Sequence, residues 1–205
     1  MLKLGSYKNG EIRPANLHGD WWGMFIEEDS TYFRKVEVLF TALEPDVQYD
    51  WEWSISVEND EKCDWLIQGI DFVGAAVKYE SSTNRSYGGG NLREPKKICI
   101  DAVYSCFISD HLNDDLGYQF IYTNEEGESQ QVIRYLGYSE AYMQEATPIY
   151  VDIDWIGDMD GDGFNDFILS YNSSELEHKT ALYLSSKAEE GELVKEVAFV
   201  MDRGC

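Results

Sequence analysis

The segment W-I-G-D-M-D-G-D-G-F-N-D-F-I-L-S-Y, residues 155–171, decides the fold, because it joins two apolar runs through a short acidic loop. Four aspartates fall within this loop: Asp158, Asp160, Asp162 and Asp166. Closing a loop that brings like charges together costs free energy, and a divalent cation removes that cost. Gly161 and Gly163 allow the sharp turns that such a loop needs. Carboxylates on a tight, glycine-containing loop are typical Ca²⁺ ligands, so the segment predicts a calcium site.

The positions that follow exclude an EF-hand. The backbone carbonyl of Phe164 falls at the seventh position of such a loop and Asp166 at the ninth, and both positions supply oxygens. The twelfth position, which carries a bidentate glutamate in an EF-hand, is Leu169. Residues 167–171 are rich in apolar and aromatic side chains and predict a strand, where an EF-hand has its exiting helix. We therefore predict a structural calcium ion held by the four aspartates and the Phe164 carbonyl; Mg²⁺ is disfavoured because it takes few carboxylates.

This loop resembles the FG-GAP or VCBS type of calcium loop, D-x-D-G-D-G-x-x-D followed by a hydrophobic strand. The match is residue for residue at Asp158, Asp160, Asp162, Gly163 and Asp166. Such loops are best known from integrin-type propellers, which carry several of them. One such loop occurs in these 205 residues, and no repeat of 20 to 50 residues is visible. The resemblance therefore implies the calcium loop but not the propeller.

A wider segment, residues 152–205, looks like the C-terminal module of a group of exported bacterial proteins of unassigned function. This resemblance implies export and a metal-clamped β-fold, and it implies no activity. Calcium loops of extracellular modules bind with Kd of about 10⁻⁴ to 10⁻³ M, which also favours a compartment outside the cytoplasm. The first residues, M-L-K-L-G-S-Y-K-N-G, lack the apolar run of a signal peptide. We expect a periplasmic or extracellular protein whose export signal is not in this sequence.

Alternating apolar and polar residues predict strands in the rest of the chain. In residues 49–57, for example, aromatic and aliphatic side chains occupy every second position. The predicted strands cover residues 21–26, 32–40, 49–57, 65–73, 98–108, 118–123, 132–136, 149–153, 167–171, 181–184 and 194–200. We expect an all-β or mainly β fold, an antiparallel sandwich or curled sheet with at most one or two short helices, one of them near residues 139–145. The expected organisation is a single β-rich domain over residues 1–205, with residues 150–205 as a calcium-loop module.

The charge of the chain restricts its partners. The sequence has 39 acidic and 16 basic side chains, a formal net charge of −23. Phosphate recognition needs a basic surface, so nucleic acid is excluded as a partner. No stretch approaches the length of a membrane span. A basic protein would be steered toward this surface, which predicts a cationic protein partner.

Four cysteines bear on the compartment and on crosslinks: Cys63, Cys99, Cys106 and Cys205. The run I-C-I-D-A-V-Y-S-C-F-I reads as one strand, which would hold Cys99 and Cys106 too far apart for a disulfide. Two pairings are then open, one joining Cys63 to Cys99 and Cys106 to Cys205, the other exchanging the partners. Buried free thiols are the alternative to both pairings.

Evidence for catalysis is weak. Ser109, Asp110 and His111 are adjacent in the chain, and adjacent residues rarely face one another as a catalytic set does. We therefore expect a non-enzymatic protein that binds another protein, as an inhibitor or immunity factor against a basic effector. A calcium-stabilised carbohydrate-binding module is the first alternative, because the chain has six tryptophans and fourteen tyrosines. An unrecognised hydrolase is the second alternative, since any two of the many carboxylates could meet in space.

Overall fold

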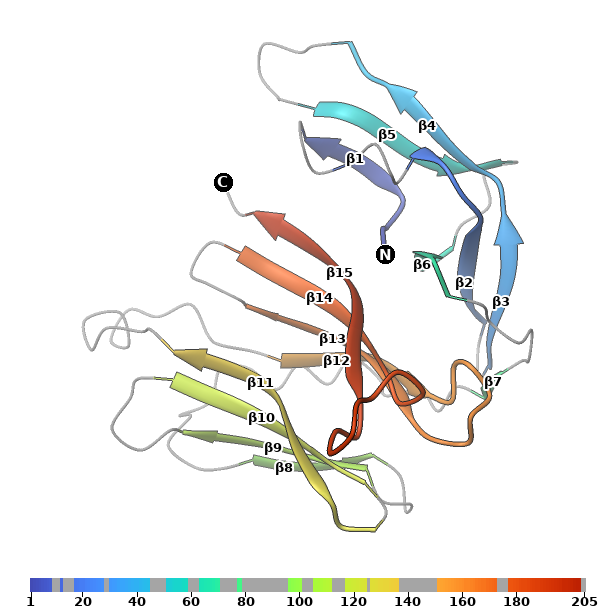
Figure 1. Cartoon of the computed structure of the whole chain (residues 1–205). Coiled ribbons are helices and arrows are strands. Elements are labelled where there is room, and N and C mark those ends of the chain that lie inside the picture. Colours follow the sequence, from blue (N-terminus) through green and yellow to red (C-terminus); the bar gives the residue numbers. More distant parts are fainter. Residues whose placement is uncertain are drawn as a thin grey trace. The chain divides into compact units, whose positions relative to one another are not determined.

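The protein is built from strands. The computed structural model describes residues 1–8, 12, 17–27, 30–44, 51–58, 63–70, 77–78, 96–100, 105–111, 117–124, 126–136, 151–172 and 177–203. These residues contain strands β1 to β15, arranged in four sheets, and no α-helix (Figure 1). The predicted all-β antiparallel fold is confirmed. The helix expected near residues 139–145 lies outside the described residues.

The chain divides into two compact units. The first consists of Met1–Glu80 and Gly157–Gly161, and the second of Ser81–Ile156 and Asp162–Cys205. The boundary passes through the acidic loop. The single domain expected over residues 1–205 stays a prediction. Among the residues that the structure describes, none lies in a helix with the length and apolar character that a membrane crossing requires.

The first unit contains two sheets, of strand orders β6-β2-β3-β7 and β1-β5-β4. Their strands are β1 (Gly5–Lys8), β2 (Trp21–Glu27), β3 (Ser30–Val36), β4 (Val38–Ala42), β5 (Trp51–Val57), β6 (Trp65–Gln68) and β7 (Val77–Lys78). The prediction of one strand over residues 32–40 is corrected here, because the chain passes from one sheet to the other at Glu37. The Glu37 carbonyl accepts a hydrogen bond from the Glu58 amide at 3.0 Å, which secures this crossing.

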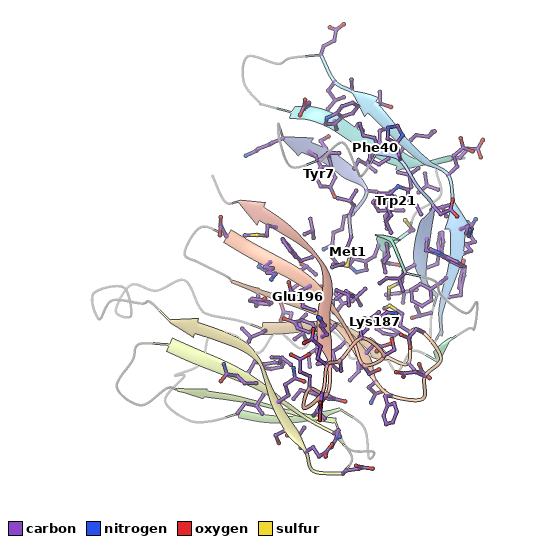
Figure 2. The ribbon with its side chains drawn as sticks, viewed as in Figure 1. Met1, Tyr7, Trp21, Phe40, Lys187 and Glu196 are labelled. Atoms are coloured by element: carbon purple, nitrogen blue, oxygen red, sulfur yellow. The ribbon has the colours of Figure 1, made fainter. Side chains whose placement is uncertain are left out.

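Aromatic side chains link the two sheets of the first unit. Trp21 of β2 and Phe40 of β4 lie close together, with ring centroids 6.2 Å apart (Figure 2). Trp21 and Trp65 are each only 4% exposed, so they belong to the core as their place in strands predicted. Leu2 forms an isolated antiparallel bridge with Leu66, through two backbone hydrogen bonds of 2.8 Å.

The second unit contains two four-stranded sheets, of orders β11-β10-β9-β8 and β12-β13-β14-β15. Their strands are β8 (Lys96–Ile100), β9 (Ser105–His111), β10 (Gly117–Thr123), β11 (Ser129–Leu136), β12 (Val151–Gly157), β13 (Asp166–Asn172), β14 (Glu177–Leu184) and β15 (Lys195–Arg203). One buried cluster draws side chains from both sheets, among them Phe120 and Ile133 from the first and Phe167 and Ala181 from the second. Two sheets that share one apolar core form a β-sandwich.

The prediction of a single strand over residues 98–108 is wrong. Two strands, β8 and β9, lie there and pair antiparallel, with Cys99 directly opposite Cys106. Glycine and proline, which usually reveal a turn, are absent from this stretch, so its apolar residues read as one continuous strand. Cys99 and Cys106 are therefore not held apart on one extended strand, as the single-strand prediction implied.

Cys63 is a buried free thiol in the first unit. Burial, with a contribution from the charge of Asp64, raises the pKa of this thiol to about 11. Since the thiolate is the reactive form, we expect native Cys63 to react with iodoacetamide at about pH 8 at least ~100-fold more slowly than in the denatured chain. The reaction should accelerate as the pH rises toward 11. Mass spectrometry of the alkylated peptide measures both rates, and equal native and denatured rates would contradict the burial of this thiol.

Candidate metal centre

The acidic loop connects β12 to β13, which are neighbours in one sheet. Gly161 and Gly163 have positive φ angles of 80° and 91°. A Cβ placed on either glycine would meet nothing within 4 Å. The backbone angle, and not crowding, is therefore what requires glycine at these two positions. The prediction that both glycines form sharp turns is confirmed.

Two aspartates of the loop hold its backbone through their side chains. An oxygen of Asp158 accepts a hydrogen bond from the Gly161 amide at 2.7 Å. An oxygen of Asp162 accepts one from the Phe164 amide at 2.8 Å. Hydrogen bonds in which a short carboxylate side chain accepts from a backbone amide two or three residues later stabilise a tight turn. They use donors from within the loop, so the sequence specifies this turn locally.

Three of the aspartates come together. Asp158, Asp160 and Asp166 each offer one carboxylate oxygen, and these oxygens all lie within 4.8 Å of one another. Oxygens bound to one calcium ion at about 2.3–2.6 Å can be at most ~5 Å apart, so the three fit a shared ion. Asp166 is fully buried, and Asp158 and Asp160 are half-buried. Three negative charges this close repel one another unless a cation neutralises them.

One carboxylate oxygen of Asp160, Oδ1, is buried without a hydrogen-bond partner in the described part of the chain. Asp160 as a whole has a further interaction. Buried carboxylate oxygens usually accept a hydrogen bond or bind a metal ion. The environment of this atom is therefore compatible with a bound cation.

Ser185 fixes the position of the buried aspartate. Its amide donates a hydrogen bond to an oxygen of Asp166 at 2.8 Å, and its hydroxyl lies 2.9 Å from the same oxygen. The hydroxyl also lies 2.9 Å from the second oxygen of Asp162. Ser185 directly follows β14, and the pairing of Phe167 with Tyr183 brings it beside the start of β13.

The sequence analysis did not identify Ser185. A serine after an apolar strand is unremarkable in a sequence, and only the register between β13 and β14 places it beside Asp166. The signal that could have found it is the small polar pair Ser185-Ser186 at the end of the run A-L-Y-L. That signal is weak without knowledge of the strand pairing.

Three of the predicted aspartate ligands lie in one group, and the fourth does not. Asp158, Asp160 and Asp166 form the group. Asp162 lies outside the group, and its two oxygens accept from the Phe164 amide and contact Ser185. The Phe164 side chain is 66% exposed, so it serves no core role, and the metal-binding role of its carbonyl stays a prediction.

We expect Ser185→Ala to weaken metal binding, because it removes a hydroxyl contact that orients Asp166. Loss of an outer hydrogen bond to a metal ligand typically costs about 10–100-fold in affinity, and we expect the lower end since the Ser185 amide still donates. Ser6→Ala is the matched control, because Ser6 is exposed on β1 in the first unit and its replacement should leave the affinity unchanged. Calcium titration calorimetry measures both variants, and equal affinities would refute the positioning role of Ser185.

Three buried tryptophans bear on the carbohydrate alternative, which stays a prediction. Trp21, Trp65 and Trp155 are buried, with exposures of 4%, 4% and 0%. A hollow of about 420 Å³ in the first unit has Trp21 and Phe40 in its wall together with the ion pair of Asp20 and Lys35. Because Trp21 is buried, its ring offers no open face on which a sugar could stack. The large hydrophobic side chains exposed in the described part of the chain are Leu39, Phe164 and Phe199.

Comparisons with known proteins add no assignment. A scan against models of protein families, a search of curated proteins and a search of solved structures each found no match.

Proposed function

We propose that this chain is a non-enzymatic, calcium-stabilised β-protein that binds another protein. The observation that carries the proposal is the convergence of Asp158, Asp160 and Asp166 on one point between two strands. Calcium is the preferred ion, because three carboxylates suit Ca²⁺, whereas Mg²⁺ is usually held by one or two and keeps its waters. The likeness of the loop to FG-GAP and VCBS calcium loops supports the same ion.

The ion has a structural role in this proposal. The loop joins the end of β12 to the start of β13, and Ser185 connects it to the end of β14. A cation in the loop would therefore fix the same ends of three neighbouring strands of one sheet. The three aspartates repel one another, and in this proposal the ion neutralises that repulsion. The stability of the folded state therefore depends on calcium. Such a dependence suits a protein that works outside the cytoplasm, where calcium is plentiful, and we place the protein there.

The partner in this proposal is a basic protein, which the chain binds as an inhibitor or immunity factor. The support is electrostatic: a formal charge of −23 attracts a cationic surface over distances of about a Debye length. Association of this kind becomes slower and weaker as salt rises.

Calcium titration calorimetry on the full chain tests the metal part of the proposal. We expect a single site with Kd of about 10⁻⁴ to 10⁻³ M for Ca²⁺ and weaker binding of Mg²⁺. Absence of calcium binding to the folded chain would overturn the proposal.

The partner part needs its own experiment. The immobilised protein, held in millimolar calcium, is offered a set of purified basic effector proteins at low salt and at about 0.5 M salt. Saturable one-to-one capture of one of them, weakened by salt, supports the proposal. If the protein captures all basic proteins equally, the binding is nonspecific charge attraction. That result would overturn the proposed role as an inhibitor.

A further inference from the structure

Two cysteines occupy directly opposite register positions on a pair of strands in the second unit. Cys99 lies on β8 and Cys106 on β9, and the antiparallel register pairs them directly. The Cα atoms of directly opposite residues are about 4.5 or 5.5 Å apart, depending on whether the pair is hydrogen-bonded. Both values lie within the range of about 4.4–6.8 Å that disulfides span. We propose that Cys99 and Cys106 form a disulfide that links β8 to β9.

The surrounding register supports this placement. The pairs on either side, Ile98 with Phe107 and Ile100 with Ser105, continue the ladder without a bulge. On its other side β9 pairs with β10, where Cys106 lies opposite Thr123. A shift of β8 by one residue would move Cys99 to the other face of the sheet, and the unbroken ladder opposes such a shift.

The position of β8 in its sheet makes closure of the bond easy. In the order β11-β10-β9-β8, β8 is an edge strand and β9 is held on both sides. The Cβ atoms of opposite residues are typically about 4.5–5.5 Å apart, and a disulfide needs about 3.5–4.5 Å. Among the described strands, β8 is hydrogen-bonded on one side only, so it can approach β9 without breaking a second described ladder.

The pairing also assigns the other cysteines. Cys63 is a buried free thiol, so it is not available to Cys99 or Cys106. The oxidised chain then has one disulfide, between Cys99 and Cys106, and thiols at Cys63 and Cys205. This replaces both of the pairings that the single-strand prediction favoured. The inference does not depend on the calcium site or on the proposed function.

The reaction is an ordinary thiol oxidation by disulfide exchange. Each cysteine loses the hydrogen of its S–H bond, and one S–S bond forms between the two sulfurs. The two electrons and two protons go to a small disulfide such as oxidised glutathione, whose own S–S bond breaks to give two thiols. The product ties the edge strand covalently to the body of its sheet, which removes conformational freedom from the unfolded chain.

Peptide mapping of the full chain tests the pairing. The protein is equilibrated with oxidised and reduced glutathione, denatured, alkylated and digested with trypsin. Cleavage after Lys97 and Arg134 gives a peptide of residues 98–134, which holds both cysteines. We expect this peptide to be unalkylated and lighter by two hydrogen atoms, while the peptides with Cys63 and Cys205 are alkylated. A second cut within residues 100–105 should leave its two halves linked.

Each other result overturns the proposal. Peptide 98–134 linked to a peptide that contains Cys63 or Cys205 would restore one of the earlier pairings. Peptide 98–134 alkylated at both cysteines, under conditions that oxidise exposed dithiols, would show that the pair does not form.

A thermal experiment gives a second readout. We expect reduction to lower the melting temperature of the wild-type second unit by about 5 °C and to leave the double variant Cys99→Ser, Cys106→Ser unchanged. The control Cys205→Ser should keep the full response to reduction. An equal response of the double variant and the wild type would contradict the crosslink.

Discussion

Replacement of Asp160 by asparagine should leave the stability unchanged or raise it without calcium, and should lower the stability with calcium. In the presence of a chelator, Asp160→Asn removes one of three mutually repelling carboxylates, so the variant should be as stable as the wild type or more stable. In calcium, the variant has a neutral amide oxygen in place of a charged carboxylate, so it binds the ion more weakly and should be the less stable protein. A residue with only a packing role would shift both conditions in the same direction.

The size of the effect follows from linkage. With Kd of about 10⁻⁴ to 10⁻³ M, about 10 mM calcium stabilises the wild type by about 1.4–2.7 kcal/mol. For a chain of this size each kcal/mol corresponds to about 2–4 °C, so calcium should raise the melting temperature of the wild type by about 3–11 °C. Loss of the negative charge of a direct ligand should weaken calcium binding by about 100-fold, the upper figure for the loss of an outer hydrogen bond, and this removes nearly all of the shift.

Asp20→Asn is the matched control. It changes the net charge by the same amount, and Asp20 forms an exposed ion pair with Lys35 in the first unit. Its melting temperature should rise with calcium as the wild type does. Equal calcium-induced shifts in Asp160→Asn and Asp20→Asn would refute the assignment of Asp160 as a ligand.

Replacement of Phe167 by alanine should have the largest effect on the stability of the sandwich. Phe167 is fully buried in the cluster between the two sheets, and its ring centroid lies 5.1 Å from that of Tyr122 and 5.2 Å from that of Tyr183. Removal of a buried phenyl ring loses its transfer free energy and leaves a cavity, at a cost of about 3–5 kcal/mol. Denaturant unfolding followed by fluorescence or circular dichroism measures this loss.

Phe164→Ala provides a control within the same segment. Phe164 is 66% exposed, and its replacement should change the free energy of unfolding by less than about 0.5 kcal/mol. The substitution keeps the backbone carbonyl, so calcium affinity should also be unchanged. Phe167→Leu, which should cost about 1–2 kcal/mol, covers the case in which the alanine variant does not fold. Unfolding midpoints of Phe167→Ala and Phe164→Ala that coincide would contradict the placement of Phe167 in the core.

The acidic loop shows how far local chemistry carries a sequence prediction. The glycine angles at Gly161 and Gly163 and the turn-forming bonds of Asp158 and Asp162 involve residues at most three positions apart. Sequence spacing therefore predicted the loop and the strand after it. Strands in general were predicted where apolar residues alternate, because a side chain on one face of a sheet recurs every second residue.

Predictions failed where the outcome depended on residues distant in the chain. Glu37 divides an apparently continuous strand because the chain changes sheets there, and Glu58 supplies the hydrogen bond. The sequence between Cys99 and Cys106 has no glycine or proline to indicate that β8 ends and β9 begins there. Ser185 meets Asp166 only through the register of β13 and β14.

The amino-acid sequence by itself determined the all-β class, the acidic loop and the aspartates within it, since each of these depends on close neighbours along the chain. The tertiary structure alone decided which three aspartates converge, which serine supports them and which cysteines occupy opposite positions in the strand register. These depend on strand pairing and register, in which many weak contacts between distant segments sum to one arrangement, and no short stretch of sequence contains that sum.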